Sequence, residues 1–276
     1  MKNILIPTDF SENSWNAIEY ALHFLSKSVC NFYLLHVTTN QSLAEPRETN
    51  NQEAHSLTLN VSAKTRLQDL ISRIQVHFPN SPHRFFSVTD SGFMVNSIRE
   101  HVAQKKIDLI IMGTKGRTDY KELAIGINAG NVITKVKCAT LVIPQNARYG
   151  GIKDIAFATD FSIFHRPEIL QPITDIVETH QAAVNVLHVN RNGMELNEDQ
   201  RKNREHLDDY FSNCNHSFHF ITNKQIEVAV QQFVDDKNID VIAMMAKNLN
   251  YFQKILFHPT SNNISYYKNV PFLVLH

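Results

Sequence analysis

Short apolar runs alternate with longer segments of helical period along the chain. In the first half the runs are rich in Ile, Leu, Val and Phe, and they cover residues 4–8, 32–38, 84–88, 109–112 and 140–143. Nearly continuous apolar runs of this length indicate strands buried on both faces of a sheet. Between them, apolar residues at helical spacing predict helices over residues 11–28, within 48–77, and over 93–105 and 127–136. This alternation predicts a parallel sheet with right-handed crossovers and helices on both faces.

The same plan occurs twice in the chain. ILIPTDFS at 4–11 recurs as IAFATDFS at 155–162, LLHV at 34–37 as VLHV at 186–189, DLIIM at 108–112 as DVIAM at 240–244, and ATLVI at 139–143 as PFLVL at 271–275. Four matches in one order predict two tandem domains, 1–146 and 151–276, with a boundary where Pro144, Gly150 and Gly151 interrupt the pattern. Second-half strands are expected at 154–159, 184–190, 217–221, 241–245 and 272–275.

Composition narrows the class of protein. The chain has 276 residues, of which 43% are apolar, so each half can bury a core. The formal net charge of +0 gives no general reason to expect a nucleic-acid or anionic-membrane partner. Three scattered cysteines form neither a disulfide framework nor a zinc motif. With no apolar run long enough to span a bilayer and no signal peptide, we expect a cytoplasmic protein.

A ligand site is expected at the carboxyl ends of the first and fourth strands. Ligands of open parallel sheets bind there, where the strand order reverses. The segment that leaves the fourth strand contains Gly113 and Gly116, and Gly126 then opens the fourth helix. Small residues let backbone N–H groups approach a phosphate, and Lys115 and Arg117 add positive charge. From the glycines alone, an ordinary strand-to-helix loop is the favoured interpretation.

The three glycines have the G-x2-G-x9-G spacing of the universal stress protein family. The chain also resembles that family in ILIPTDFS, LLHV, DLIIMGTKG and KCATLVIP. The resemblance spans nearly the whole chain, once in each half. It implies α/β domains with doubly wound, parallel five-stranded sheets of strand order 3-2-1-4-5, a Rossmann-like fold of the adenine nucleotide alpha hydrolase type. It also implies an intrachain pseudo-dimer through the final strands, with a homodimer of chains as a further option.

The ATP-binding branch of that family supplies the expected site residues. By resemblance, Pro7, Thr8 and Asp9 would meet the nucleoside, and the Val37 backbone would meet the adenine. The loop and helix start would be formed by Met112, Gly113, Gly116, Gly126, Ile127 and Asn128. The implied ligand is ATP, or AMP or ADP, with Mg²⁺ as a candidate companion.

Two departures qualify this expectation. Ile127 stands where the ATP-binding branch has Ser or Thr, so a hydroxyl donor to phosphate is missing. In the second half, ungapped alignment replaces the three glycines by Met245, Asn248 and His258. We therefore expect nucleotide in the first domain only.

Three functions stay open at this point. The first is a nucleotide-binding and sensing module of the stress response, a role implied by the resemblance alone. The second is a ligand-free interaction scaffold in which both sites are degenerate. The third is a weak ATPase or phosphotransferase that works through Asp9 and Mg²⁺. The sequence offers no nucleophile–base–acid set, so we expect no dedicated enzyme.

Other polar residues have plainer interpretations. Asp9 is as well explained as a helix cap as it is as a ligand, and Asp160 is better explained as a cap. His36 and His188 lie inside apolar strands and are expected to be hydrogen-bonded core histidines. His216 and His219 should face opposite sides of their strand, which disfavours a metal site. Cys138 lacks a neighbouring base and is expected to be unreactive.

Overall fold

The computed structural model describes residues 1–38, 52–114, 126–191, 193–247 and 269–276. The elements of the first half are β1 (Lys2–Pro7), α1 (Glu12–Phe24), β2 (Cys30–Thr38), α2 (Gln52–His77), β3 (Arg84–Ser91), α3 (Met94–Lys105), β4 (Leu109–Gly113), α4 (Ile127–Lys135) and β5 (Thr140–Ile143). Those of the second half are β6 (Asp154–Ala158), α5 (Pro167–His180), β7 (Ala183–Asn190), α6 (Glu198–Phe211), β8 (His216–Thr222), α7 (Ile226–Lys237), β9 (Val241–Met245) and β10 (Phe272–Leu275).

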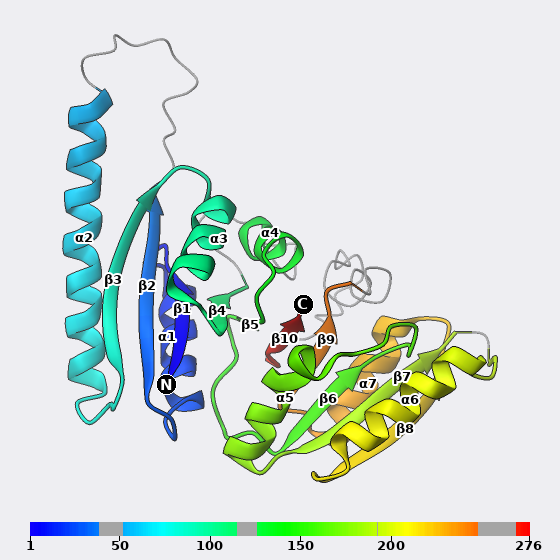
Figure 1. The fold of residues 1–276 in the computed structure, drawn as a ribbon. Helices are drawn as coiled ribbons and strands as arrows, with labels where there is room; N and C mark the ends of the chain where they lie inside the picture. The colour runs from blue at the N-terminus through cyan, green and yellow to red at the C-terminus, as the bar shows by residue number, and fades with distance from the viewer. Residues whose placement is uncertain (39–51, 115–125, 192, 248–268) are drawn as a thin grey trace.

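These strands form one sheet that runs through both halves (Figure 1). Its order is β3-β2-β1-β4-β5-β10-β9-β6-β7-β8, so the second half mirrors the first. Every pairing within a half is parallel, and the strand order 3-2-1-4-5 is found on each side. The predicted doubly wound α/β class is confirmed.

The two halves meet through their final strands. β10 pairs antiparallel with β5, with Leu273 beside Leu141 and Phe272 beside Val142. The pairing expected between these two strands is therefore present within one chain. It covers one edge of each five-stranded unit, which an isolated unit would leave exposed.

The core lies on both faces of the sheet because successive strand residues point to opposite sides. In β1, Ile4 and Ile6 pack with α1 and α2, whereas Leu5 packs with α3 and α4; all three are fully buried. Continuous apolar strands are thus explained by helices on both faces. Within the described ranges, no helix is long and apolar enough to cross a membrane.

Helix α1 begins where the sequence predicts it. The Oγ of Ser11 accepts a hydrogen bond from the Ser14 N–H at 3.2 Å and so caps the first turn. Its apolar side chains Trp15, Ile18 and Leu22 lie against the sheet. The cap fixes where α1 begins after the turn that leaves β1, and this turn contains the predicted site residues Thr8 and Asp9.

Candidate functional site

The carboxyl ends of β1 and β4 lie side by side. β1 pairs with β4 at Leu5 and Ile110, and this register continued by two residues brings Pro7 level with Met112. Both side chains are buried. The structure therefore places two of the predicted segments next to each other, at the point where strand order reverses.

A compact turn leaves β1. The Thr8 Oγ1 accepts a hydrogen bond from the Phe10 N–H at 3.0 Å, and the Asp9 Oδ1 accepts one from the Ser11 N–H at 3.0 Å. Phe10 has φ +62°, a left-handed conformation that costs free energy in a bulky residue. Thr8 is buried, so its hydroxyl serves the turn itself.

The second half repeats this turn. Phe161 has φ +57°, and its N–H donates to the Thr159 Oγ1 at 3.0 Å. The Asp160 Oδ1 accepts from the Ser162 N–H at 2.9 Å. Because the turn persists where the glycine pattern does not, Thr and Asp at these positions have a structural role that is independent of any ligand.

A histidine supports each turn from the neighbouring strand. The His36 Nδ1 lies 2.8 Å from the Thr8 carbonyl oxygen, and the His188 Nδ1 lies 3.1 Å from that of Thr159. Burial lowers the pKa of His188, although the bond to Thr159 acts in the opposite direction. Both histidines are hydrogen-bonded as predicted; His188 is buried in the core, whereas His36 is only partly buried. Val37 follows His36 and is partly buried among the apolar residues on the α3 and α4 side.

Gly113 ends β4 against α1. A Cβ on Gly113 would lie 2.8 Å from the Asn13 Nδ2, and Asn13 is buried. The small residue is therefore needed for packing, whether or not a phosphate approaches. Sequence reasoning missed Asn13, whose only signal is its place in the first turn of α1.

The start of α4 is held against the end of β4. The Gly126 N–H donates to the Thr114 carbonyl oxygen at 2.6 Å, and the Thr114 N–H donates to that of Ile143 at 3.0 Å. Gly126 is the N-cap and provides no side-chain cap to the first turn of α4. Ile127 is 58% exposed, so its side chain is not packed into the core. Asn128 is also exposed.

The described residues bring most of the predicted site together. Pro7, Thr8 and Asp9 lie at the end of β1, and Met112 and Gly113 lie at the end of β4. Gly116, together with Lys115 and Arg117, lies outside the described residues. The binding roles of these residues remain predictions, and the described ones at β1 and β4 lie at the carboxyl ends of the two strands.

In the second half, side chains of α6 contact the turn at the carboxyl end of β6. From α6, the Gln200 Nε2 donates to the Asp160 carbonyl oxygen at 2.8 Å, and the Asn203 Nδ2 donates to that of Phe161 at 2.8 Å. Met245 is buried in β9, where Gly113 stands in the first half. Asn248 and His258 lie outside the described residues.

Our interpretation of Asp160 as a helix cap is wrong. Helix α5 starts at Pro167, and its N-cap is Arg166, which makes no side-chain cap bond. Residues 162–165 separate the turn from the helix, a segment that the first half lacks. Asp160 therefore holds a local turn by accepting from the Ser162 N–H, as Asp9 does by accepting from the Ser11 N–H in front of the Ser11 cap.

The remaining candidate side chains are His216, His219 and Cys138. His216 lies 2.8 Å from Asp208 on α6, whereas His219 packs on Phe233 of α7, so the two face opposite sides of β8 as predicted. No group of three or more metal-ligating side chains occurs among the described residues. Burial raises the pKa of the Cys138 thiol to about 12, which keeps it protonated and weakly nucleophilic.

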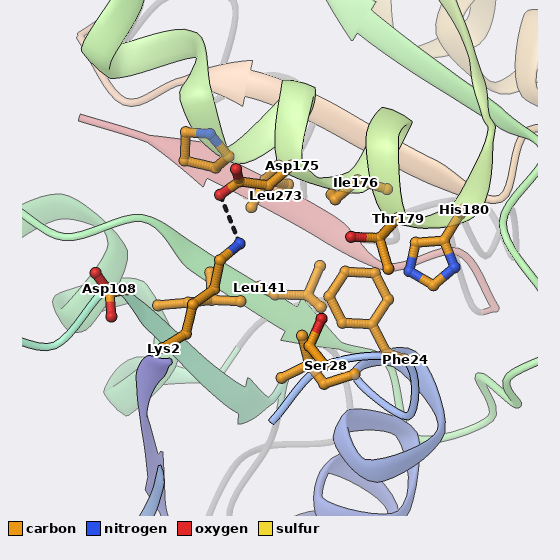
Figure 2. Close-up of a pocket in the computed structure, with 13 residues that line it drawn as sticks. Lys2, Phe24, Ser28, Asp108, Leu141, Asp175, Ile176, Thr179, His180 and Leu273 are labelled. Atoms are coloured by element: carbon orange, nitrogen blue, oxygen red, sulfur yellow. Dashed lines mark hydrogen bonds and ion pairs between the residues drawn. The ribbon is translucent and has the colours of Figure 1, made fainter. Parts of the chain in front are cut away.

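A separate cavity of about 50 Å³ lies between the halves (Figure 2). Its walls come from α1, α5 and the strands, and the Lys2 Nζ lies 2.6 Å from the Asp175 Oδ2 across it. Because Lys2 starts β1, this cavity lies at the amino ends of the strands, away from the glycine segment. It is too small for a nucleotide and belongs to the junction.

Comparisons with known proteins agree with this architecture. The family model described as the universal stress protein family matches residues 1–144, which is more than half of the chain. The chain therefore belongs to the universal stress protein family.

Three relatives define the similarity further. The chain is 27% identical to universal stress protein MJ0531 of Methanocaldococcus jannaschii over 144 residues, covering 52% of this chain and 82% of that one. It is 28% identical to MJ0577 of the same organism over 160 residues, covering 52% and 95%. A solved universal stress protein from Archaeoglobus fulgidus aligns with 99% of this chain and 97% of its own, at 16% identity and a TM-score of 0.70. That structure shows that the fold of the whole chain has a solved counterpart.

Proposed function

We propose that this protein is a nucleotide-binding and sensing module that takes an adenine nucleotide in its first half only. The observation that carries the proposal is the hydrogen bond from the Gly126 N–H to the Thr114 carbonyl oxygen. It puts the positive end of the α4 dipole beside the ends of β1 and β4. The phosphates would lie against this end of α4, and the nucleoside would lie over Pro7, Thr8 and Asp9.

The residues present fit such a ligand in part. Gly126 leaves the first turn of α4 without a side-chain cap, which suits an anion that approaches the backbone. The Asp9 carboxylate is partly exposed and can accept a bond from a ribose hydroxyl. Ile127 supplies no hydroxyl, and one lost bond to a charged group weakens binding by about ten- to a hundred-fold.

In this proposal the second half has a structural role. Its turn after β6 is bonded to α6 by Gln200 and Asn203, and Phe161 is fully buried among aromatic rings. The side chain of Met245 occupies the position of Gly113. The turn after β6 is therefore engaged in contacts within the protein, and a bulky residue stands where the first half has Gly113, which favours a structural role for the second half.

We propose binding rather than turnover as the activity. The turn at Asp9 uses the carboxylate to order the backbone, which leaves less of it for proton transfer or metal binding. A ligand-free scaffold is the second candidate, and it is favoured by one observation: the exposed residue at the helix start is Ile127. Cys30, Cys138 and Cys214 are free thiols, so we propose a cytoplasmic location.

Identification of a co-purified ligand tests the proposal. The full chain is purified, denatured, and its released small molecules are identified by mass spectrometry, while thermal unfolding is followed with and without millimolar ATP, ADP and AMP. We expect a released adenine nucleotide or a rise in melting temperature with one of the three. An empty protein that none of them stabilises would favour the scaffold.

A further inference from the structure

Strand β8 is an open edge of the ten-stranded sheet (Figure 1). Toward β7, the Asn215 carbonyl oxygen accepts from the Val184 N–H at 2.8 Å, and the Asn223 N–H donates to the Asn190 carbonyl oxygen at 3.0 Å. Because alternate residues of a strand face opposite sides, the backbone groups of residues 216, 218, 220 and 222 point away from β7. No described residue forms a backbone hydrogen bond with this outer row.

This edge lacks the usual protection against pairing. β8 reads HSFHFIT and contains no Lys, Arg, Asp, Glu, Pro or Gly. Phe220 is 52% exposed in it. The opposite edge, β3, carries Arg84 and Asp90 within the strand. Charged residues in an edge strand are one way in which sheets prevent edge-to-edge pairing, so β8 is the edge that remains open to it.

The central residue of β8, His219, has a phenylalanine on each side. Phe218 and Phe220 both lie near the Phe161 ring, at 6.3 and 6.1 Å. We propose that β8 pairs antiparallel with β8 of a second copy of this chain, with a two-fold axis at His219.

The backbone pattern fits this register. In it, Phe218 stands opposite Phe220 of the partner subunit. Both residues point their backbone groups outward, so they form a hydrogen-bonded pair that exchanges two bonds. The two phenyl rings face each other across the strands, a cross-strand aromatic pair of the kind that stabilises sheets. The exposed surface of Phe220 becomes buried twice, once in each copy.

The expected dimer is weak. A single strand pair with flanking side chains buries less surface than a standard interface of about 1,600 Å². We therefore expect dissociation constants of about 1–100 μM. We place a second copy on this edge because it supplies an aromatic residue opposite Phe218 and opposite Phe220, which an arbitrary extended peptide does not.

Sedimentation of the full chain over a concentration series up to about 100 μM tests the pairing. The wild type should shift from monomer to dimer mass, whereas Phe220→Lys should stay monomeric because it puts an edge charge into the pair. Phe86→Lys is the matched control: Phe86 is 41% exposed on the other edge strand, and this variant should dimerise like the wild type. A wild type that stays monomeric, or a dimer that survives Phe220→Lys, overturns the proposal.

Cysteine cross-linking tests the register. The two copies of residue 219 would form a non-hydrogen-bonded pair with Cα atoms about 4.5 Å apart, within disulfide range. In a Cys214→Ser background, His219→Cys should form a disulfide-linked dimer under mild oxidation. Ser217→Cys, on the same face but far from its own copy, should not. Equal cross-linking of both variants, or of neither, contradicts a two-fold axis at His219.

Discussion

Asn16 and Arg148, which are 132 residues apart in the chain, are joined by a hydrogen bond of 2.5 Å from the Arg148 Nη1 to the Asn16 Oδ1. The Asn16 Nδ2 also donates to the carbonyl oxygens of Pro144 and Ala147, at 3.1 and 3.2 Å. One buried amide on α1 therefore anchors the segment that connects the halves. The connection is held in place by the first half.

Replacement of this amide should destabilise the protein. Asn16→Leu removes the hydrogen bonds of this buried amide to the connecting segment and takes from Arg148 the acceptor Oδ1, which costs about 1–3 kcal/mol. Urea denaturation of the full chain should show a lower midpoint for this variant. Gln171→Leu is the control, since Gln171 is exposed on α5, and it should change stability by less than about 0.5 kcal/mol. Equal midpoints for Asn16→Leu and wild type would show that the anchor contributes nothing.

Restoring a hydroxyl at the start of α4 should strengthen nucleotide binding. Ile127→Ser adds a donor where Ile127 is already exposed, so folding should be unaffected. We expect affinity for ATP to rise by about ten-fold or more. Isothermal titration calorimetry measures this, with Ile127→Val as a control of similar shape without the hydroxyl. If both variants bind ATP equally, the hydroxyl is irrelevant here.

Gly113→Ala should reduce stability without any ligand present. The added Cβ would lie 2.8 Å from the Asn13 side chain, which is buried and must move. Overpacking of this kind costs about 1–3 kcal/mol. Gly150→Ala is the matched control, because a Cβ there meets nothing within 4 Å. Thermal unfolding of the two ligand-free variants should separate them; identical melting temperatures would mean that Asn13 adjusts freely.

The two aspartates of the repeated turn should respond differently. Asp9→Asn should weaken nucleotide binding if the first half is the site, whereas Asp160→Asn should leave affinity unchanged. Both carboxylates accept a local N–H bond, at 3.0 and 2.9 Å, so each substitution disturbs the corresponding turn. Titration with ATP distinguishes them. A large loss of affinity in Asp160→Asn would refute the assignment to one half.

Acid should destabilise the second half through His165. This residue is 2% exposed, packs on Phe157, and has no hydrogen-bond partner for either ring nitrogen among the described residues. Burial lowers its pKa to about 4, against an unfolded value of about 6.5. Because the folded pKa is the lower one, the unfolded state binds the proton first as pH falls. Stability is therefore present above pH 6.5 and lost down to about pH 4, by about 3 kcal/mol.

Equilibrium unfolding at several pH values between 7 and 4 checks this expectation. His165→Leu should show a smaller loss of stability over that range than the wild type. His77→Leu, at an exposed position of α2, should keep the wild-type dependence. An unchanged slope in His165→Leu would show that other groups control the response to acid.

The sequence was sufficient for the architecture because its signals are local and repeated. Runs such as 140–143 and 241–245 match the observed strands, and the Ser11 cap marks the start of α1. The pairing of β5 with β10 is predicted because each would otherwise be an uncovered edge strand of its sheet. Each of these predictions depends on the hydrophobic period or on the internal repeat, and both can be read in a single sequence.

Other features depend on contacts that no local pattern reveals. The fit of Asn13 against Gly113, and the bonds from Gln200 and Asn203 to the turn of the second half, join residues by tertiary packing. The interpretation of Asp160 as a helix cap is wrong because its turn repeats that of Asp9, whereas the helix after it begins only at Pro167. The glycine at 113 pointed toward a phosphate, but packing alone already requires it.

The antiparallel contact of β5 with β10 also bears on how the halves can diverge. Two copies of a single-domain chain that associate through this contact would dilute apart and would carry identical sequences. In a covalent pair, the connecting segment keeps the local concentration of each partner high whatever the amount of protein in the cell. One half can therefore change at the ends of its strands without losing its contact with the other half, and Met245, which stands where the first half has Gly113, is a change of this kind.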